Sequence, residues 1–213
     1  MHLIALTTSE AILEFLQKGG VFIWPLIICS VAGLTAIGFK LMSLARSRIV
    51  PETLVRELEN ISSEDSETAI QNLRSGNSTL ARLGTVAINH HGHPVSEISR
   101  AVEASAREEV VKMHAGIGVL DVVITVAPLL GLLGTASGLV TIFQGLGDTN
   151  DNIIIARGIA EALNTTIFGL SVAVPCVIAQ SYFVRRIERL TARLEGVMAP
   201  FISSCSRTQT LAD

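Results

Sequence analysis

Charged side chains are scarce in this chain of 213 residues. Asp, Glu, Lys and Arg together make up 16% of it, whereas a soluble domain carries about a quarter. The net charge of −3 excludes a strongly basic surface for nucleic acid, and 4% aromatic residues argue against a stacking platform. Only 3 cysteines are present, so a disulfide framework is excluded as well. This composition indicates a membrane protein that binds no nucleic acid.

The first of three long apolar runs extends from Val21 to Phe39. It contains no charged residue and matches the roughly 20 residues needed to cross the hydrocarbon core of a bilayer. A cleaved signal peptide is a weaker interpretation, because Glu10 and Glu14 precede the run where a basic cluster is typical. Basic residues follow the run at Lys40, Arg46 and Arg48. We therefore predict a first membrane span over residues 21–44.

Two further apolar runs, Val122 to Phe143 and Gly158 to Phe183, are also long enough to span a bilayer. Each contains a proline, Pro128 in the second run and Pro175 in the third. Membrane helices tolerate proline where neighbouring groups satisfy the freed carbonyls. The sequence thus predicts three membrane-spanning helices, with membrane lipid around them.

The distribution of basic residues orients these helices. Basic residues follow the first run and also the third, at Arg185, Arg186, Arg189 and Arg193. The loop between the second and third runs, residues 144–157, has one arginine beside Asp148 and Asp151. Because cytoplasmic loops carry the excess of Lys and Arg, we expect the N-terminus outside the cytoplasm and the C-terminus inside.

The segment between the first two spans, residues 45–114, is too long for a simple loop. Apolar residues recur in it at helical spacing: Leu54, Leu58 and Ile61, then Ile70 and Leu73, then Leu80, Leu83 and Val86. Pro51 is expected to open the first of these helices, and Gly76 to end the second. From Ser96 to Phe143 the only proline is Pro128, so we predict one long helix that runs into the second span. The third span is predicted to continue as an amphipathic helix through Ile187, Leu190, Leu194 and Val197.

The predicted fold is an all-α membrane protein with three transmembrane helices and long cytoplasmic helical extensions. The second span is expected to be continuous with the helix before it. In chain order, we expect an external N-terminal segment (1–20), the first span (21–44) and a cytoplasmic helical region (45–114). The second span (115–143), an external loop (144–157), the third span (158–183) and a cytoplasmic C-terminal helix and tail (184–213) follow.

Polar residues within the spans are the candidates for function. Thr135 lies among glycines in the second span, and Glu161, Thr165 and Thr166 lie near the start of the third. Small, hydroxyl-bearing helix faces either pack closely against other helices or line a hydrated path, and the sequence leaves both interpretations open. A carboxylate at membrane depth is costly and usually functional. However, Glu161 stands four residues after Arg157, so a simple ion pair at the outer interface is the alternative.

The sequence shows no catalytic or metal-binding set in a plausible place. His90, His91 and His93 cluster in NHHGHP, but a fourth ligand is missing, and a solvated turn is the better interpretation. Ser137 has no histidine in the spans to act as its base. We therefore expect no enzyme activity, cofactor or metal. Since no acid lies at mid-membrane, a proton relay would need a carboxylate from a partner enclosed by an oligomer of this chain.

Two motifs carry a family resemblance: APLLGLLGTASG at residues 127–138 and GIAEALNTTIFGLSVAVP at 158–175. The start of the first span, GGVFIWPL at 19–26, fits as well. Through these motifs the sequence resembles the MotA/TolQ/ExbB family of ion-driven motor subunits, and its ExbB branch most closely. The order of the spans and the large cytoplasmic segment agree with the resemblance along nearly the whole chain.

The resemblance implies a homopentamer in the bacterial inner membrane, with residues 1–20 and 144–157 in the periplasm. Its central pore would hold the single-span helices of an ExbD-like partner, which supplies the missing membrane Asp. A TonB-like protein would carry the resulting work to outer-membrane receptors. The resemblance also implies that Thr135 and Thr166 line the ion path and that Glu161 is the acid of the third span.

Four alternatives remain open on the sequence. Thr165 precedes Thr166 where many proton-driven members have alanine, and a doubled threonine resembles some sodium-driven stators, so Na⁺ is the alternative to the H⁺ that we expect. A TolQ-like role in envelope integrity shares the same motifs. A flagellar-type stator would have four spans, and this chain supplies three. A passive scaffold, finally, predicts that Thr135→Ala and Thr166→Ala are silent.

Overall fold

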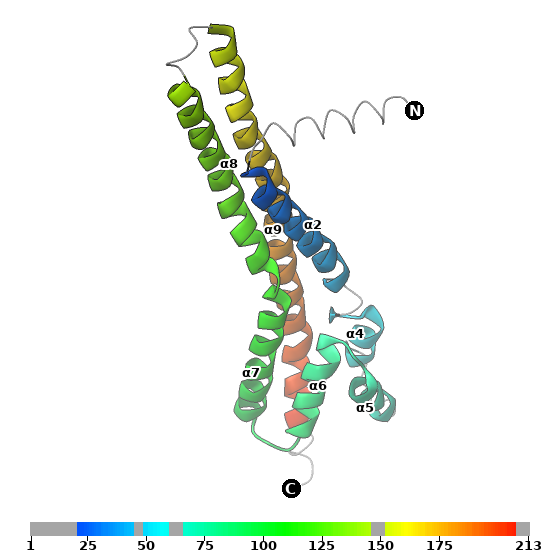
Figure 1. Cartoon of the computed structure of the whole chain (residues 1–213). Helices are drawn as coiled ribbons and strands as arrows, with labels where there is room; N and C mark the ends of the chain where they lie inside the picture. Colours follow the sequence, from blue (N-terminus) through cyan, green and yellow to red (C-terminus); the bar gives the residue numbers. More distant parts are fainter. Residues whose placement is uncertain (1–20, 45–48, 60–65, 146–151, 208–213) are drawn as a thin grey trace, which may run out of the picture. The chain divides into compact units, whose positions relative to one another are not determined.

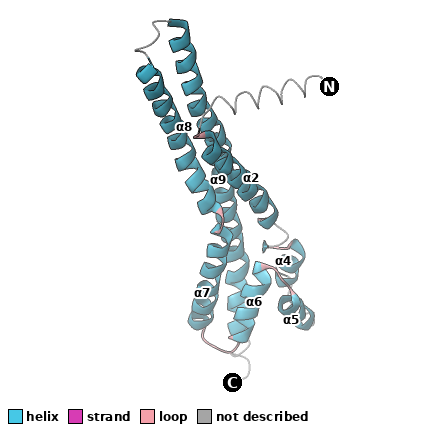
Figure 2. Ribbon diagram, in the orientation of Figure 1, coloured by secondary structure: helices cyan, strands magenta, loops and turns pink. Residues whose placement is uncertain are grey.

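The computed structural model describes residues 21–44, 49–59, 66–145 and 152–207, in which every regular element is an α-helix (Figure 1, Figure 2). These residues form two compact units. The membrane unit contains the described residues of Met1–Gly38 and Gly116–Ser181, and the second unit those of Phe39–Ala115 and Tyr182–Asp213. Two helices contribute to both units: α2 (Ile23–Ser43) and α9 (Asn152–Arg207).

Three helices are long and apolar enough to cross a membrane: α2, α8 (Ile117–Gly145) and α9. In the membrane unit, α8 and α9 lie side by side and antiparallel (Figure 1). Large apolar side chains stay exposed on these helices; Trp24, for example, is 70% exposed and Phe143 65%. Such surface is unfavourable in water but suits lipid. The prediction of three candidate membrane-spanning helices is therefore confirmed.

Small residues let α8 and α9 approach until their backbones touch. A Cβ atom placed on Gly131 would lie 2.9 Å from the carbonyl oxygen of Thr165, and one on Gly169 would lie 2.5 Å from that of Ala127. Both distances are shorter than real Cβ contacts, so only glycine fits at these two positions. The packing interpretation of the glycines is the one that the structure supports.

The second unit begins with short helices whose limits match the sequence signals. They are α4 (Glu52–Glu59), α5 (Ser66–Ser75) and α6 (Thr79–Asn89), followed by α7 (Val95–His114). Pro51 directly precedes α4, and its carbonyl oxygen accepts a hydrogen bond of 3.1 Å from the backbone N–H of Val55. Gly76 directly follows α5. The two helix limits predicted at Pro51 and Gly76 are thus confirmed, while Ile61 lies outside the described residues.

The C-terminal half of α9 contributes buried side chains to the core of the second unit. Its buried side chains recur every three or four residues: Phe183, Ile187, Leu190, Leu194, Met198, Phe201 and Ile202. Apolar residues of α6 and α7 are buried with them, among them Leu80, Leu83, Ile98 and Val102. The predicted amphipathic continuation of the third span is confirmed.

The prediction of one continuous helix from Ser96 to Phe143 is wrong. The chain forms α7 and α8 as separate helices, with Ala115 and Gly116 between them. Gly116 has a φ of 84°, a left-handed conformation that favours glycine. The Lys40 side chain donates a hydrogen bond of 2.6 Å to the carbonyl oxygen of Met113, in the last turn of α7. The break is stabilised because a cation satisfies a carbonyl that the helix end leaves without its partner.

The loop predicted over residues 144–157 is shorter than expected. Helix α8 extends through Gly145, and α9 already begins at Asn152; residues 146–151 lie outside the described part. The sequence from 152 to 157 is NIIIAR, which contains neither glycine nor proline. Nothing in it interrupts a helix, so α9 starts before its apolar run.

Candidate functional site

The three threonines predicted to be functional meet in one hydroxyl cluster between α8 and α9. The Oγ1 of Thr135, on α8, lies 3.4 Å from the Oγ1 of Thr165 and is hydrogen-bonded to the Oγ1 of Thr166, both on α9. Thr135 is 9% exposed and Thr165 4%, whereas Thr166 is half-buried. Of these three side chains, Thr166 is therefore the one most open to whatever lies beside the two helices.

Two backbone carbonyls complete this cluster. The oxygen of Gly131 lies 3.1 Å from the hydroxyl of each of the three threonines. The oxygen of Ala162 lies 3.1 Å from the hydroxyl of Thr135 and 2.8 Å from that of Thr165. Each hydroxyl has one proton to donate and can also accept. The cluster therefore has several arrangements of donors and acceptors that differ only by rotation of O–H bonds.

The glycines of the GLLGT motif position the hydroxyls. A Cβ atom on Gly134 would lie 2.7 Å from the Oγ1 of Thr165, so a larger residue would displace that side chain. Gly131 precedes Thr135 by one helical turn and brings its own carbonyl to all three hydroxyls. The sequence pointed to the threonines. It did not reveal the two carbonyl acceptors, because close helix contact alone brings them within reach.

Glu161 lies apart from the hydroxyls. Its carboxylate is 3.4 Å from the Nε of Arg157, and its side chain is 37% exposed, so the expected ion pair is present. Glu161 and Thr165 both line a groove of about 330 Å³ in the membrane unit, together with Gly134 and Gly138. Thr165 thus belongs to both the groove and the hydroxyl cluster, as does Ala162 through its carbonyl oxygen, and these two residues connect the groove of Glu161 with Thr135.

A second polar contact joins α8 and α9 within the membrane unit. The side-chain amide of Gln180 donates a hydrogen bond to the carboxylate of Asp121. Both residues are away from the threonines along their helices, near the end of α8 that begins at Ile117. This contact was not among the predictions made from the sequence.

The histidine cluster forms a turn after α6, as predicted. The Nδ1 of His90 lies 2.9 Å from the carbonyl oxygen of Val86, and the Nδ1 of His93 lies 3.2 Å from that of His90. Gly92 takes a φ of 86° and closes the turn. Within the described parts of the chain, no group of three or more His, Cys, Asp or Glu residues is arranged to hold a metal ion.

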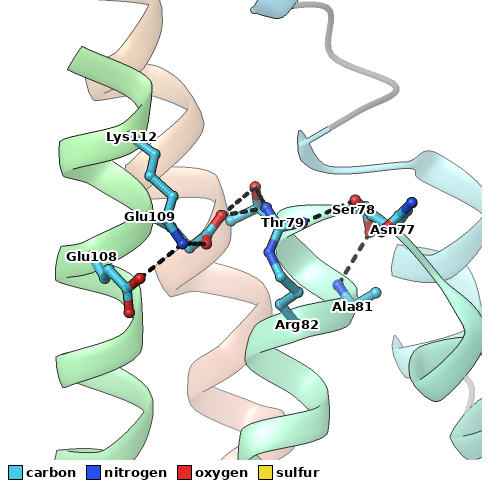
Figure 3. A network of polar contacts seen from close by, with 8 residues as sticks. All are labelled: Asn77, Ser78, Thr79, Ala81, Arg82, Glu108, Glu109 and Lys112. Atoms are coloured by element: carbon cyan, nitrogen blue, oxygen red, sulfur yellow. Dashed lines mark hydrogen bonds and ion pairs between the residues drawn. The ribbon is translucent and has the colours of Figure 1, made fainter. Parts of the chain in front are cut away.

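A buried ion cluster in the second unit has no counterpart in the sequence predictions. The carboxylate of Glu109, on α7, is 6% exposed and forms an ion pair with Arg82 of α6 (Figure 3). Lys112 lies 3.0 Å from it, and the hydroxyl of Thr79 lies 3.3 Å from it. Burial raises the pKa of Glu109, but hydrogen bonds from Arg82 and Lys112 outweigh burial and hold that pKa below its usual value. We interpret this cluster as a structural contact that stabilises the packing of α6 against α7.

Comparison with known proteins agrees with these motifs. A model of the MotA/TolQ/ExbB proton channel family matches residues 77–196. An ExbB-like biopolymer transport protein of Synechocystis is 34% identical over 181 residues, which cover 79% of this chain and 69% of the relative. The biopolymer transport protein exbB1 of Vibrio cholerae is 28% identical over 196 residues, or 89% of this chain and 86% of the relative. The Tol-Pal system protein TolQ of Pseudomonas aeruginosa is 37% identical over 98 residues, or 45% of this chain and 42% of the relative.

The family match covers more than half of the chain, including the threonine cluster, Glu161 and the buried Glu109. Proteins of this family are channel and motor components that work in multi-subunit complexes, not enzymes. The apolar helices and the family together make this a multi-pass membrane protein. The chain belongs to the MotA/TolQ/ExbB proton channel family, as a motor subunit of the ExbB/TolQ type.

Proposed function

We propose that the chain is an ExbB-like subunit of a proton-driven motor in the bacterial inner membrane. With an ExbD-like single-span partner, it would energise TonB-dependent uptake across the outer membrane. The ExbB branch is supported by the ExbB-like protein and exbB1, which align with 79% and 89% of this chain; TolQ of Pseudomonas aeruginosa and ExbB of Salmonella typhimurium each align with 45%. The basic residues after the first and third spans support an N-terminus in the periplasm and a C-terminus in the cytoplasm.

The observation that carries this proposal is the hydroxyl cluster of Thr135, Thr165 and Thr166. An isolated carboxylate in hydrocarbon costs at least several kcal/mol, so an acid that titrates inside a membrane needs hydrogen-bonding groups beside it. The half-buried Thr166 hydroxyl can donate a hydrogen bond to an ionised carboxylate of the partner, or accept a hydrogen bond from its neutral form. In the second case Thr166 donates instead to the carbonyl of Gly131, 3.1 Å away. The cluster can thus follow the protonation state of the partner's Asp.

Five copies of the chain are proposed to surround the partner's helix, with this cluster facing it. Protons would reach the cluster through the groove that Glu161 and Thr165 share. The Glu161 carboxylate lines that groove, and the buried hydroxyl of Thr165 connects the groove to Thr135. Passage of the proton would shift the partner inside the ring, and a TonB-like protein would transmit that movement.

Proton flux into liposomes that contain the chain and its partner tests the proposal. Thr166→Val keeps the side-chain volume and removes the hydroxyl, so we expect flux to fall roughly fivefold, as for the loss of a hydrogen bond of about 1 kcal/mol. Thr125→Val is the matched control, because the Thr125 hydroxyl is exposed on α8, donates to the backbone carbonyl of Asp121 in its own helix and belongs neither to the cluster nor to the groove of Glu161. The Asp→Asn variant of the partner gives the background level of proton flux. Equal flux in the two threonine variants would leave the cluster as packing, as a passive scaffold requires.

A sodium-driven motor is the second candidate. Three hydroxyls and two carbonyl oxygens come together around Thr135, and such hard oxygen atoms are the ligands that small hard cations prefer. The same liposomes distinguish the two ions, since flux would then follow the sodium gradient and be indifferent to pH. A TolQ-like role is tested separately in two kinds of cell. Restored envelope integrity in cells that lack TolQ would support that role, whereas restored iron uptake in cells that lack ExbB would support the ExbB-like role.

A further inference from the structure

The arginines that follow the apolar part of α9 do not lie on a flat surface. Arg186, Arg189 and Arg193, with Leu190, line a pocket of about 220 Å³ in the second unit. We infer that this pocket binds the phosphate of an anionic phospholipid headgroup. Guanidinium groups suit this ligand because their planar N–H forks form paired hydrogen bonds with phosphate oxygens.

The pocket keeps an excess of positive charge. Arg193 is neutralised locally, since one of its terminal nitrogens lies 2.9 Å from both carboxylate oxygens of Glu52. Arg186 and Arg189 have no ion pair with a carboxylate among the described residues. Two positive charges therefore face the pocket with no counter-ion from the described part of the chain.

The two uncompensated arginines differ in how they are held. Arg186 is fixed, because its Nε donates a hydrogen bond of 3.1 Å to the carbonyl oxygen of Leu44. The Nε of Arg189 donates a hydrogen bond of 3.2 Å to the carbonyl oxygen of Arg185, and this side chain makes no other hydrogen bond within the described parts of the chain. Its two terminal nitrogens are the groups most available to a ligand.

Their place along α9 favours a lipid phosphate over a soluble anion. The apolar run ends at Phe183, so at 1.5 Å per residue Arg186 and Arg189 lie about 4.5 Å and 9 Å beyond it. The headgroup layer extends roughly 5–8 Å beyond the hydrocarbon core, and arginine side chains can reach back toward it. Tyr182, 45% exposed and with its hydroxyl 3.4 Å from Arg186, is a residue type typical of the membrane interface.

The test uses the full chain in detergent, titrated with phosphatidylglycerol and followed by native mass spectrometry. Phosphatidylcholine with the same acyl chains is the uncharged reference, and we expect it to bind more weakly. Arg189→Gln should lower the apparent affinity for phosphatidylglycerol about fivefold, as expected for one arginine at a membrane surface. Arg185→Gln is the matched control, because Arg185 is exposed on the same helix, carries the same charge and does not line the pocket. The affinity of the Arg185→Gln variant for phosphatidylglycerol should stay close to that of the original chain.

Arg189→Lys separates charge from geometry, and should bind less tightly than the original chain although the charge is kept. Circular dichroism of each variant checks that the helices are intact. Equal losses in Arg185→Gln and Arg189→Gln would overturn the pocket, since they would indicate only a general attraction of positive charge. Equal binding of the two lipids would overturn it as well. Displacement of phosphatidylglycerol by an excess of inorganic phosphate would show a soluble-anion site instead and overturn the assignment to lipid.

Discussion

Lys40 on α2 and Met113 on α7 are joined by a hydrogen bond of 2.6 Å from the ammonium group of the lysine to the carbonyl oxygen of the methionine. The lysine is 1% exposed, although it is a residue type that is rarely buried. Its charge lies in the last turn of α7, where helix carbonyls have no partner in the helix and a cation is stabilising. One side chain thus fastens the end of α2 to the end of α7 and accompanies the break before α8.

Replacement of Lys40 by methionine should test this contact. The variant keeps an unbranched side chain that can fill the same space, but it leaves the carbonyl of Met113 without its donor. We expect the free energy of unfolding in detergent to fall by about 1–3 kcal/mol. Hydrogen exchange at the end of α7 should accelerate. Arg107→Met is the control: Arg107 is 78% exposed on α7 and pairs with the exposed Glu103, so a loss of about 0–1 kcal/mol is expected there. Equal losses of unfolding free energy in the two variants would show that the buried contact of Lys40 stabilises the fold no more than a surface ion pair does.

Gly169 on α9 should not tolerate even one methyl group. Its Cβ would lie 2.5 Å from the carbonyl oxygen of Ala127, and backbone there has no room to move without separating α8 from α9. We expect Gly169→Ala to lower the free energy of unfolding by about 1–3 kcal/mol. Gly196→Ala, on the same helix, would meet nothing within 4 Å and should be neutral or stabilising by up to about 1 kcal/mol. Denaturant titration of the two variants measures the difference, and similar midpoints would contradict the close helix contact.

The ion cluster around Glu109 should make the stability of the second unit depend on pH. Its folded pKa is lowered by Arg82 and Lys112 in spite of burial, so the ionised carboxylate stabilises the folded state. That contribution is complete above the unfolded pKa of about 4.3 and is lost as the pH falls through the lower folded pKa. Glu109→Gln should therefore cost about 1–3 kcal/mol at pH 7, and progressively less below about pH 4. Unfolding curves measured across this range would contradict the cluster if the cost did not change with pH.

Much of the fold follows from periodicity in the sequence. The three apolar runs predicted α2, α8 and α9 because each is long and almost free of charge, and that property depends on no other part of the chain. Pro51 and Gly76 marked the limits of α4 and α5 for a local reason, since proline opens a helix and glycine ends one. Signals of this kind lie within one helical turn of their effect.

The features that the sequence did not predict depend instead on contacts between residues far apart along the chain. The break before Gly116 is accompanied by a hydrogen bond from Lys40, a residue 73 positions from Met113 along the chain, and a lone glycine in an apolar pattern does not by itself end a helix. The pairing of Arg82 with Glu109 likewise joins residues 27 positions apart. At the candidate site, the motifs identified the threonines, but only the approach of α8 to α9 decides that Thr165 connects Thr135 with the groove of Glu161.

The last prediction separates the charge of Glu161 from its ion pair with Arg157. Their side chains are 37% and 73% exposed, so this pair contributes only about 0–1 kcal/mol and neither Glu161→Gln nor Arg157→Gln should disturb folding. If the carboxylate passes protons to the hydroxyl cluster, Glu161→Gln should lower proton flux about tenfold, which corresponds to about 1.4 kcal/mol in the barrier. Arg157→Gln removes the same ion pair but keeps the Glu161 carboxylate, so flux should persist. Equal loss in both variants would assign the effect to the pair, and unchanged flux in Glu161→Gln would exclude Glu161 from the path.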